Sequence, residues 1–333
     1  MNKANTSQPR KINLALQGGG SHGAFTWGVL DRLLEDDRVV VDGITGASAG
    51  AMNAVVYADG LLDGGVEGAK KALHDFWKSV SGHPSVGALK VPSLMEFAGA
   101  GFDLMSRMFS PYQTNPFNIN PLRDMLNAQI DFERLRQHSP VKLFICATNV
   151  RSGRIKVFEN GELSCDVLLA SACLPFVFQA VEVGGEHYWD GGYMGNPPLF
   201  PLYYETDTRD ILIVQINPIE RDDVPDTSQE IIDRLNEISF NTPLMLELRA
   251  IDFVNRLLRE ERVDPKKYKH LNIHAINAEN KMRTFGASSK SNTDWTFLQA
   301  LHKIGHDAAD QWLVENFDDI GDRSSINIGQ KFL

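Results

Sequence analysis

The fold is decided by residues 12–57, which read INLALQGGGSHGAFTWGVLDRLLEDDRVVVDGITGASAGAMNAVVY. A short apolar run over residues 12–16 ends in a glycine cluster, and residues 24–34 then carry apolar side chains at helical spacing. Residues 39–57 repeat this order, with a β-branched run, a turn of small residues and a second helical pattern. Two strand–turn–helix units in succession predict parallel strands covered by helices.

The rest of the chain adds further strands and then helices. We expect strands over residues 141–148, 154–158, 179–183, 211–216 and 271–276. Helical spacing is found over residues 66–80, from Ser228 onward and over residues 295–317. Because proline lacks a backbone donor, we expect the helix that begins near Ser228 to break near Pro243.

The composition of the chain bounds its class and its partners. At 333 residues and 43% hydrophobic, the chain is long enough to bury a large core. Its formal net charge of -10 disfavours nucleic acid and anionic lipid surfaces as partners, which leaves a small molecule or a single lipid. The three cysteines, Cys146, Cys165 and Cys173, lack metal-site spacing, so we interpret them as reduced packing residues. The polar start and the absence of an apolar run of about 18 residues favour a soluble, cytoplasmic protein with no signal peptide or transmembrane segment.

A Gly-x-Ser-x-Gly pentapeptide stands between the second strand and its helix. Its residues are Gly46, Ala47, Ser48, Ala49 and Gly50. A serine on a sharp strand-to-helix turn adopts a strained backbone, and only small neighbours let the turn close while the hydroxyl stays open to a substrate. This context favours a nucleophilic serine. The competing interpretation is a small-residue turn with a buried capping serine.

A second glycine-rich turn follows the first strand. It comprises Gly18, Gly19, Gly20, Ser21, His22 and Gly23. Successive backbone N–H groups in such a loop can point at one anion without side-chain interference, helped by the positive end of the helix dipole. We therefore predict an oxyanion hole, in which each donor is typically worth about 2.7–4 kcal/mol of transition-state stabilisation.

The same loop also satisfies a dinucleotide-binding pattern. Gly18, Gly20 and Gly23 match G-x-G-x-x-G, and Asp42 lies about 20 residues further on. That interpretation leaves the serine of the second turn unexplained. A P-loop is excluded because the loop lacks the Gly-Lys-Ser/Thr sequence.

A nucleophile needs a base, and Asp190 is the candidate in this sequence. It stands between aromatic residues and the glycines Gly191 and Gly192, in the sequence HYWDGGY over residues 187–193. Burial by the aromatic side chains would raise its pKa from about 3.9 toward a useful value, and the glycines allow close backbone approach. The competing interpretation is a β-turn in which Asp-Gly joins two strands.

A Ser-His-Asp triad is the alternative to an aspartate base. The histidines available for it are His270, His274, His302 and His306. None of them has a distinctive setting. His302 and His306 lie one helical turn apart among polar residues, which favours a solvated face over a two-histidine metal site, so we expect no metal. His22 lies inside the glycine loop, where packing of the turn is its simplest role.

Taken together, these segments resemble the patatin-like phospholipase family, and its bacterial members in particular. The resemblance covers roughly residues 12–202 and rests on the GGGSHG loop, the GASAG elbow and the DGG turn in that order. The sequence ASACLP at residues 170–175 and the segment 110–126 add to it. The family resemblance implies a three-layer α/β/α sandwich with a mainly parallel central sheet.

The resemblance also implies roles for individual residues. Ser48 would be the nucleophile and Asp190 its base, in a dyad without histidine, and Gly18, Gly19 and Gly20 would form the oxyanion loop. The family carries a cationic residue in this loop where the present chain has His22, so any charge contribution there would depend on pH.

The implied activity is that of a serine lipid acyl hydrolase of the phospholipase A, lysophospholipase or esterase type, acting through an acyl-enzyme. The substrate would be a lipid or another ester, met at a membrane surface, and no cofactor is required. The alternative is a catalytically silent lipid-binding or regulatory module on the same fold.

The expected organisation is one domain with an appended helical part. Residues 1–11 form a disordered tail, residues 12–216 the catalytic domain, and residues 217–333 a mainly helical part packed on the same domain. Residues 86–117 mix Met and Phe with Gly and Pro, and we interpret them as a mobile cap that serves as acyl-binding lid or interfacial patch through Phe102, Met105 and Phe109. Ordinary packing of an irregular insertion is the competing interpretation.

Overall fold

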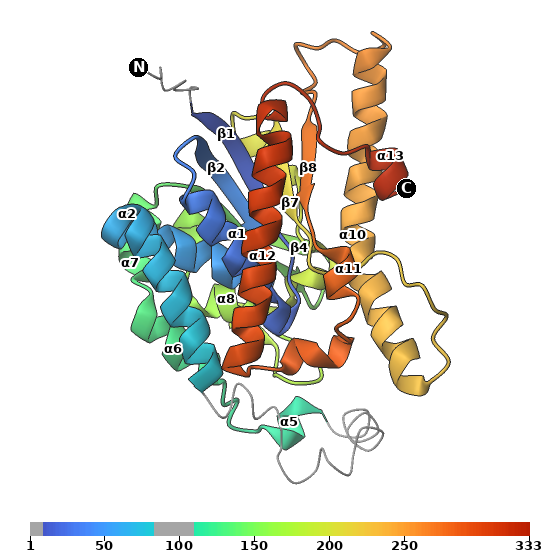
Figure 1. Cartoon of the computed structure of the whole chain (residues 1–333). Helices are drawn as coiled ribbons and strands as arrows, with labels where there is room; N and C mark the ends of the chain where they lie inside the picture. Colours follow the sequence, from blue (N-terminus) through green and yellow to red (C-terminus); the bar gives the residue numbers. More distant parts are fainter. Residues whose placement is uncertain (1–8, 83–109) are drawn as a thin grey trace.

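The computed structural model describes residues 9–82 and 110–333 (Figure 1). In this part hydrogen bonds connect an eight-stranded sheet along the path β5-β6-β3-β2-β1-β7-β8, and β4 also pairs with β3. The strands β3, β2, β1, β7 and β8 are parallel, whereas β4, β5 and β6 join by antiparallel pairing. Their bounds are β1 Arg10–Leu16, β2 Val39–Gly46, β3 Lys142–Asn149, β4 Ile155–Glu159, β5 Val181–Val183, β6 Glu186–Asp190, β7 Asp210–Val214 and β8 Asn272–Ile276.

Helices cover both faces of this sheet (Figure 1). The α-helices are α1 Gly23–Leu34, α2 Ala49–Gly82, α5 Pro111–Thr114, α6 Pro121–Gln129, α7 Phe132–His138, α8 Cys165–Ser171, α9 Phe200–Glu205, α10 Ser228–Arg259, α11 Glu279–Met282, α12 Trp295–Asn316 and α13 Ile328–Lys331. Short 3-10 turns are η1 Gly20–His22, η2 Asn160–Glu162, η3 Gly191–Tyr193, η4 Ala287–Ser291 and η5 Phe317–Asp319.

The alternation of strand side chains produces the layers. In β1, Leu14 and Leu16 join the core cluster that includes residues of α1, α2 and α12. Ala15, between them, joins the opposite cluster with residues of α9, α10 and α13. Because successive side chains of a strand point to opposite faces, the sheet is buried on both sides. The α/β fold with a mainly parallel sheet between helical layers is therefore confirmed.

Helices α1 and α12 approach each other closely in front of the sheet (Figure 1). A Cβ atom on Gly28 would overlap the backbone carbonyl of His302, and one on Gly305 would overlap the carbonyl of Phe25. Only glycine permits this backbone contact, which lets the terminal helix close the core over the first helical unit.

The expected break at Pro243 is wrong, because α10 continues through it. Proline removes one donor and crowds the preceding turn, which bends a helix without ending it when packing holds the two sides. Leu244 and Leu248, just after the proline, are buried against the sheet. The direction of α10 changes along its length in Figure 1.

Other expectations need smaller corrections. The helical patterns over residues 51–57 and 66–80 belong to α2, whose helical geometry is interrupted at Gly64 and Gly65. Strand β6 was not expected. Of the proposed cap over residues 86–117, the part that contains Phe102, Met105 and Phe109 lies outside the described residues. The domain boundaries stay predictions.

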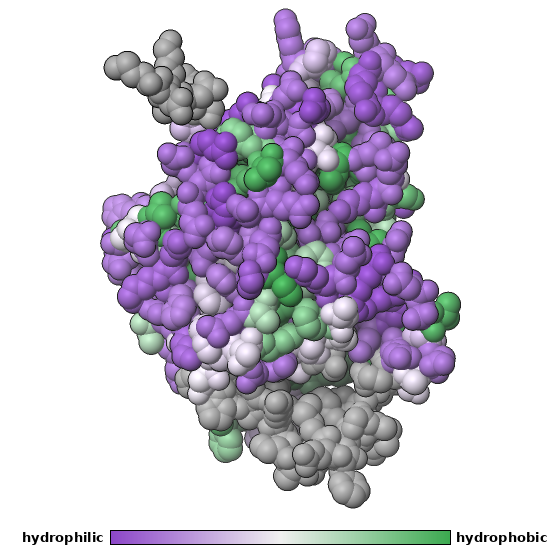
Figure 2. Space-filling view, viewed as in Figure 1, coloured by the Kyte–Doolittle hydropathy of each residue, from purple (hydrophilic) through white to green (hydrophobic). Residues whose placement is uncertain are grey.

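The surface agrees with the acidic composition. The face in Figure 2 is mostly hydrophilic, and its apolar areas are small. Among residues 9–82 and 110–333, no helix combines the length and the apolar character that a membrane span requires.

Candidate active site

The glycine loop and the GASAG elbow lie side by side because their strands are parallel neighbours. The last residues of β1 and β2, Leu16 and Gly46, are paired. Both turns therefore leave the same edge of the sheet, the carboxyl edge at which α/β proteins bind ligands. A Cβ atom on Gly18 would lie 2.7 Å from the Ala47 carbonyl oxygen and 2.8 Å from Ser48 Cβ, so the two turns touch.

Ser48 occupies a strained position on the elbow. Its φ of 52° lies in the left-handed region, which costs a non-glycine residue roughly 1–2 kcal/mol. Its side chain is half-buried while those of Ala47 and Ala49 are buried. The Ser48 N–H donates to Ser171 Oγ at 3.0 Å, which anchors the turn to the ASACLP segment. A Cβ atom on Gly50 would overlap the Leu16 carbonyl, so the elbow cannot close without this glycine.

The pairing of β3 brings Asp190 to the end of β2. β4 occupies one edge of β3 along residues 144–148. β2 pairs with residues 142–145 of β3, and β6 pairs with residues 147–149. Because both stretches overlap the one that β4 occupies, β2 and β6 lie one after the other along the opposite edge of β3. β6 enters the position that β2 leaves after Gly46, and its last residue, Asp190, pairs with Ala147. Ser48, just beyond Gly46, thus meets Asp190.

The carboxylate of Asp190 is held in the protein interior. The residue is 1% exposed, and its Oδ1 accepts the Gly192 N–H at 2.7 Å. Burial raises its pKa to about 7, against the opposing effects of the Gly192 hydrogen bond and of a hydrogen bond with the Ser48 hydroxyl. Thr148 Oγ1 donates to the Asp190 carbonyl at 2.8 Å and fixes the backbone. This is a carboxylate that can accept a proton near neutral pH.

The glycines after Asp190 allow this approach. A Cβ atom on Gly191 would overlap the Cys146 carbonyl, and one on Gly192 would meet the ring of Phe240. The Cys146 side chain is fully buried, and its Sγ donates to the Gly195 carbonyl at 3.2 Å. Cys146, Cys165 and Cys173 are all buried and free, in agreement with the packing role expected from the sequence.

Only some backbone N–H groups of the glycine loop are free to bind an anion. The Gly18 N–H is taken, since it donates to Asn196 Oδ1 at 2.7 Å. Within the described residues, the N–H groups of Gly19 and Gly20 have no acceptor. Gly20 has a φ of 58°, and a Cβ atom there would overlap the Lys290 carbonyl. The free N–H groups of this loop are therefore those of Gly19 and Gly20, whereas the Gly18 N–H is already bonded to Asn196.

His22 has the packing role expected from its place in the loop but lacks the expected charge. It is 2% exposed, it packs beside the rings of Phe285 and Phe297, and its Nε2 lies 2.7 Å from Ser289 Oγ. Burial, aided by the nearby charges of Lys290 and Arg221, lowers its pKa to about 3. The imidazole is neutral at physiological pH, so the expectation of a pH-dependent charge at this position is wrong there. Its neighbours Ser21 and Gly23 are also buried.

A buried amide network supports the loop, and sequence reasoning missed it. Its members Gln17, Asn196 and Asn217 are each at most 2% exposed. Gln17 Oε1 accepts the N–H groups of Ile216 and Asn217 at 2.9 and 3.0 Å, and Gln17 Nε2 donates to the Asn196 carbonyl at 3.3 Å. The sequence indicates this network only by position, because Gln17 directly follows β1 and Asn217 lies shortly after β7.

The triad histidines have other partners. His302 Nε2 lies 2.8 Å from Asp31 Oδ2, and His306 Nε2 lies 3.0 Å from Glu35 Oε2, both across the α1–α12 contact. His274 is fully buried, with Nε2 3.2 Å from Asp210 Oδ1. His270 lines a surface pocket with Arg259 and Tyr268. In the part of the chain that the structure covers, none of these histidines is hydrogen-bonded to Ser48 or Asp190, and no group of acidic, histidine or cysteine side chains is arranged to hold a metal.

The dinucleotide interpretation also fails on position. Asp42 lies in the first half of β2, where Lys11 Nζ approaches it at 3.8 Å and its Oδ2 accepts the Asp207 N–H at 3.2 Å. A ribose-binding carboxylate belongs at the carboxyl edge, beside the glycine loop. Asp42 is therefore too far toward the amino edge.

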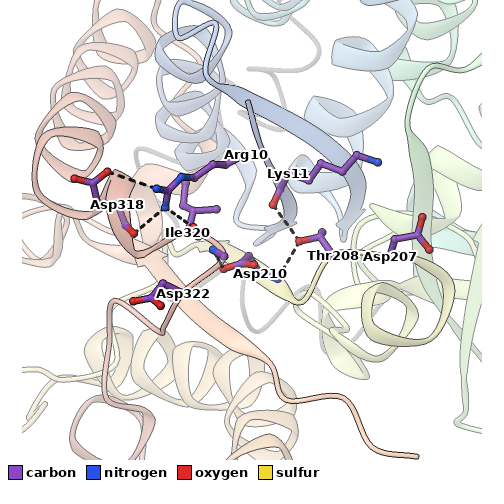
Figure 3. Close-up of a pocket in the computed structure, with 9 residues that line it drawn as sticks. Arg10, Lys11, Asp207, Thr208, Asp210, Asp318, Ile320 and Asp322 are labelled. Atoms are coloured by element: carbon purple, nitrogen blue, oxygen red, sulfur yellow. Dashed lines mark hydrogen bonds and ion pairs between the residues drawn. The ribbon is translucent and has the colours of Figure 1, made fainter. Parts of the chain in front are cut away.

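A polar pocket lies at that amino edge (Figure 3). Arg10 and Asp210, which line it, are the first residues of β1 and β7. The Arg10 guanidinium donates to the carbonyls of Phe317, Asp318 and Ile320 at 3.3, 2.7 and 2.5 Å. These contacts join the end of α12 to the start of the sheet, which is a structural role remote from Ser48.

Several known proteins are similar to parts of this chain. The family model described as "Patatin-like phospholipase" matches residues 14–203. Two proteins called "Lysophospholipase NTE1", from strains JEC21 and B-3501A of Cryptococcus neoformans var. neoformans serotype D, are 26% identical over 217 residues. That match covers 63% of this chain but only 11% of each relative, so the chain spans about a tenth of their length.

Two solved structures are similar at lower identity. VipD from Legionella pneumophila is 16% identical, with a TM-score of 0.40 over 97% of this chain and 80% of VipD. A chain of the ExoU–SpcU complex from the type III secretion system of Pseudomonas aeruginosa is 20% identical, with a TM-score of 0.32 over 95% of this chain and 64% of that chain. The family match spans more than half of the sequence and contains the loop, the elbow and Asp190. The chain belongs to the patatin-like phospholipase family.

Proposed function

We propose that the protein is a serine lipid acyl hydrolase in which Ser48 is the nucleophile and Asp190 its base. The observation that carries the proposal is a buried carboxylate with a pKa of about 7 at the hydroxyl of a serine in left-handed backbone geometry. A base of that pKa is matched to proton transfer near neutral pH. A strained, half-open serine flanked by free backbone donors is matched to acyl transfer.

The proposed reaction proceeds in two acyl-transfer steps. Ser48 Oγ attacks the ester carbonyl carbon while its proton passes to Asp190, and the N–H groups of Gly19 and Gly20 receive the oxyanion. The tetrahedral intermediate collapses, the C–O bond to the leaving alcohol breaks, and Asp190 returns the proton to that alcohol. Water then attacks the acyl-enzyme with Asp190 as base, which releases the carboxylic acid and restores Ser48.

A lipid is the proposed substrate class. Apolar side chains lie exposed just after Ser171, which holds the elbow: Leu174 is 40% exposed and Phe176 64%. Gln179 Nε2 donates to the Asn115 carbonyl at 2.8 Å, which brings the exposed Phe117 near the same segment. These side chains offer an apolar surface for an acyl chain beside the proposed nucleophile. The lysophospholipase relatives and the family support the same class.

Replacement of Ser48 by alanine tests the assignment. Ser48→Ala should lower ester hydrolysis by at least about 10³-fold, as expected when a covalent nucleophile is removed. It should also abolish labelling by a fluorophosphonate probe. Hydrolysis should be measured on lysophosphatidylcholine, phosphatidylcholine, a diacylglycerol and a short aryl ester, which identifies the preferred ester.

A matched serine variant makes the result specific. Ser152→Ala changes an exposed serine of a surface turn and should keep wild-type rates and labelling. If wild type and Ser48→Ala hydrolyse all four esters equally, the nucleophile is wrong. If neither hydrolyses or reacts while both bind lysophosphatidylcholine, the silent lipid-binding module is the better description.

A further inference from the structure

Lys290 lies against the glycine loop although it belongs to no catalytic motif of the sequence. It is part of η4, whose backbone packs directly on Gly20. The preceding residue, Ser289, is hydrogen-bonded to His22. The Lys290 ammonium donates to Asn217 Oδ1 at 2.7 Å. Segment η4 thus contacts the loop through backbone and side chains at the same time.

Asn217 connects Lys290 to the glycine loop by hydrogen bonds. Its Nδ2 donates to the Gly18 carbonyl at 2.9 Å and to Gln17 Oε1 at 3.3 Å. The ammonium of a lysine can only donate, so Asn217 must turn its oxygen to Lys290 and its NH₂ to Gly18. The orientation of this amide is therefore determined by its partners. Asn217 is 1% exposed, so no water competes for these contacts.

The geometry of one peptide group connects this network to the oxyanion site. The Gly18 carbonyl and the Gly19 N–H belong to the same planar trans peptide, so they point in opposite directions. With the carbonyl held by Asn217, the Gly19 N–H is directed away from the network. It is one of the loop donors without an acceptor in the described residues. A peptide flipped by half a turn would present a carbonyl oxygen to the oxyanion instead.

Lys290 is also one of two cationic residues whose charge acts on His22, the other being Arg221. His22 itself is neutral at physiological pH. Burial lowers the pKa of Lys290, Arg221 adds to this effect, and the carboxylates of Glu237 and Asp233 in α10 oppose it. Glu237 already forms ion pairs with Arg221 and Arg234, the latter at 3.2 Å, so its charge is shared. A cation on the Asn217 oxygen polarises the chain of hydrogen bonds that ends at the Gly18–Gly19 peptide.

We propose that Lys290 and Asn217 are positioning residues for the oxyanion loop. They fix the Gly18–Gly19 peptide with its N–H toward the reacting carbonyl, and Lys290 in its protonated form adds the positive charge that His22 does not carry. This inference rests on the proposed acyl-hydrolase function. It assigns a role in catalysis to the C-terminal part of the chain, beyond the residues that the family model matches.

The test separates kcat from KM on a soluble aryl ester. Lys290→Met and Asn217→Ala should each lower kcat by about 10- to 100-fold, less than the roughly 10²–10³-fold effect of deleting an oxyanion donor outright, because the Gly19 N–H remains. KM should stay within about twofold, since the ground-state ester needs no charge stabilisation. The rate of fluorophosphonate labelling of Ser48 should fall in parallel.

Further variants separate charge from structure. Lys290→Arg should recover most of kcat, whereas Lys290→Gln keeps a donor, removes the charge and should lie between Arg and Met. Lys281→Met, at an exposed lysine, is the matched control and should leave kcat and KM unchanged. If Met at position 290 prevents folding, which thermal unfolding would reveal, the comparison of Arg with Gln gives the same test.

The failure of this inference can be told from failure of the proposed function. If Ser48→Ala is inactive but Lys290→Gln and Asn217→Ala keep wild-type kcat, the positioning role is wrong and the dyad stands. A rise in KM with unchanged kcat would likewise overturn it. If Ser48→Ala is active, the proposed function fails first.

Discussion

As the proposed base, Asp190 should determine how activity depends on pH. In the proposed mechanism its carboxylate must be ionised to accept the Ser48 proton, and its pKa is about 7. We therefore expect kcat/KM to rise with pH through a single ionisation near 7 and to level off above it. A pH–rate profile from pH 5 to 9 on a soluble ester measures this.

The control for this profile is another carboxylate of similar pKa. Burial raises the pKa of Glu247, in α10, to about 7, but its Oε2 accepts the N–H groups of Leu199 and Phe200, both at 2.9 Å, away from Ser48. Glu247→Gln should keep the ionisation in the profile. If the Glu247→Gln profile loses this ionisation, the titrating carboxylate is Glu247 and the assignment to Asp190 is wrong.

The same shift predicts a stability change at Asp190. The folded-state pKa, about 7, exceeds the ordinary value of 3.8, so the folded protein favours the neutral carboxyl. Wild type then loses stability as pH rises from about 4 to about 7, by about 1.4 kcal/mol for each unit of pKa difference. Asparagine cannot ionise and still accepts the Gly192 N–H, so Asp190→Asn should be inactive yet more stable than wild type at pH 8.

Thermal unfolding at two pH values checks this prediction. The advantage of Asp190→Asn should be a few kcal/mol at pH 8 and should vanish near pH 4. A variant less stable than wild type at pH 8 would mean that the ionised carboxylate is well solvated or paired, against the buried setting described above.

At the residue scale, the sequence predicted only those site residues that stand in a short sequence motif. Ser48 and Asp190 stand in short glycine-flanked motifs whose geometry requires those glycines, so their proximity could be inferred. Asn217 and Lys290 have no such signature, because a buried amide or lysine is recognisable only from what surrounds it. The neutrality of His22 likewise depends on Phe285 and Phe297, which are far from it in the sequence.

At the element scale, strand β6 forms because it pairs with β3. Its sequence, EHYWD, has no clear apolar alternation, and its hairpin partner β5 is short. Pairing with β3 determines this strand, together with the turn at Gly184 and Gly185, whose φ values of 61° and 82° suit glycine. Tertiary pairing of this kind leaves little local signal, which is why the strand was missed while β1, β2 and β7 were found.

The α1–α12 contact gives a prediction for an element. Gly305→Ala places a methyl group on the Phe25 carbonyl, so the helices must move apart or strain. We expect a loss of about 1–3 kcal/mol in the free energy of unfolding, typical of overpacking. Urea unfolding measures it. Gly161→Ala, where nothing lies within 4 Å of the added atom, should change the free energy of unfolding little; equal losses in both variants would contradict the close contact.

At the scale of the whole molecule, charge should control access to membranes. The net charge of -10 repels anionic lipid surfaces, and salt screens that repulsion, with a Debye length of about 30 Å at 0.01 M and about 8 Å at 0.15 M. Hydrolysis on anionic vesicles should therefore speed up as salt is added, whereas hydrolysis on zwitterionic vesicles should not respond. A rate on anionic vesicles that falls with salt would instead indicate a local basic docking surface.

The fold class followed from the first residues of the chain because two consecutive strand–turn–helix units allow few arrangements. The helical part after residue 217 was predicted as helix, but its contact with the active-site loop was not. Nothing local in the sequence of η4 indicates that it packs on Gly20. Contacts between segments so far apart are set by the completed core and not by local preference.

The packing of η4 on the glycine loop has a consequence for the order in which the protein is made. Ser48 and the loop leave the ribosome before Asp190, which follows 142 residues after Ser48, and Lys290 follows another 100 residues later. A nascent chain therefore contains the proposed nucleophile before the segment that packs on the glycine loop has been made. Under the proposed function, hydrolytic activity would be acquired only after η4 is made, so shorter nascent chains would be poor hydrolases.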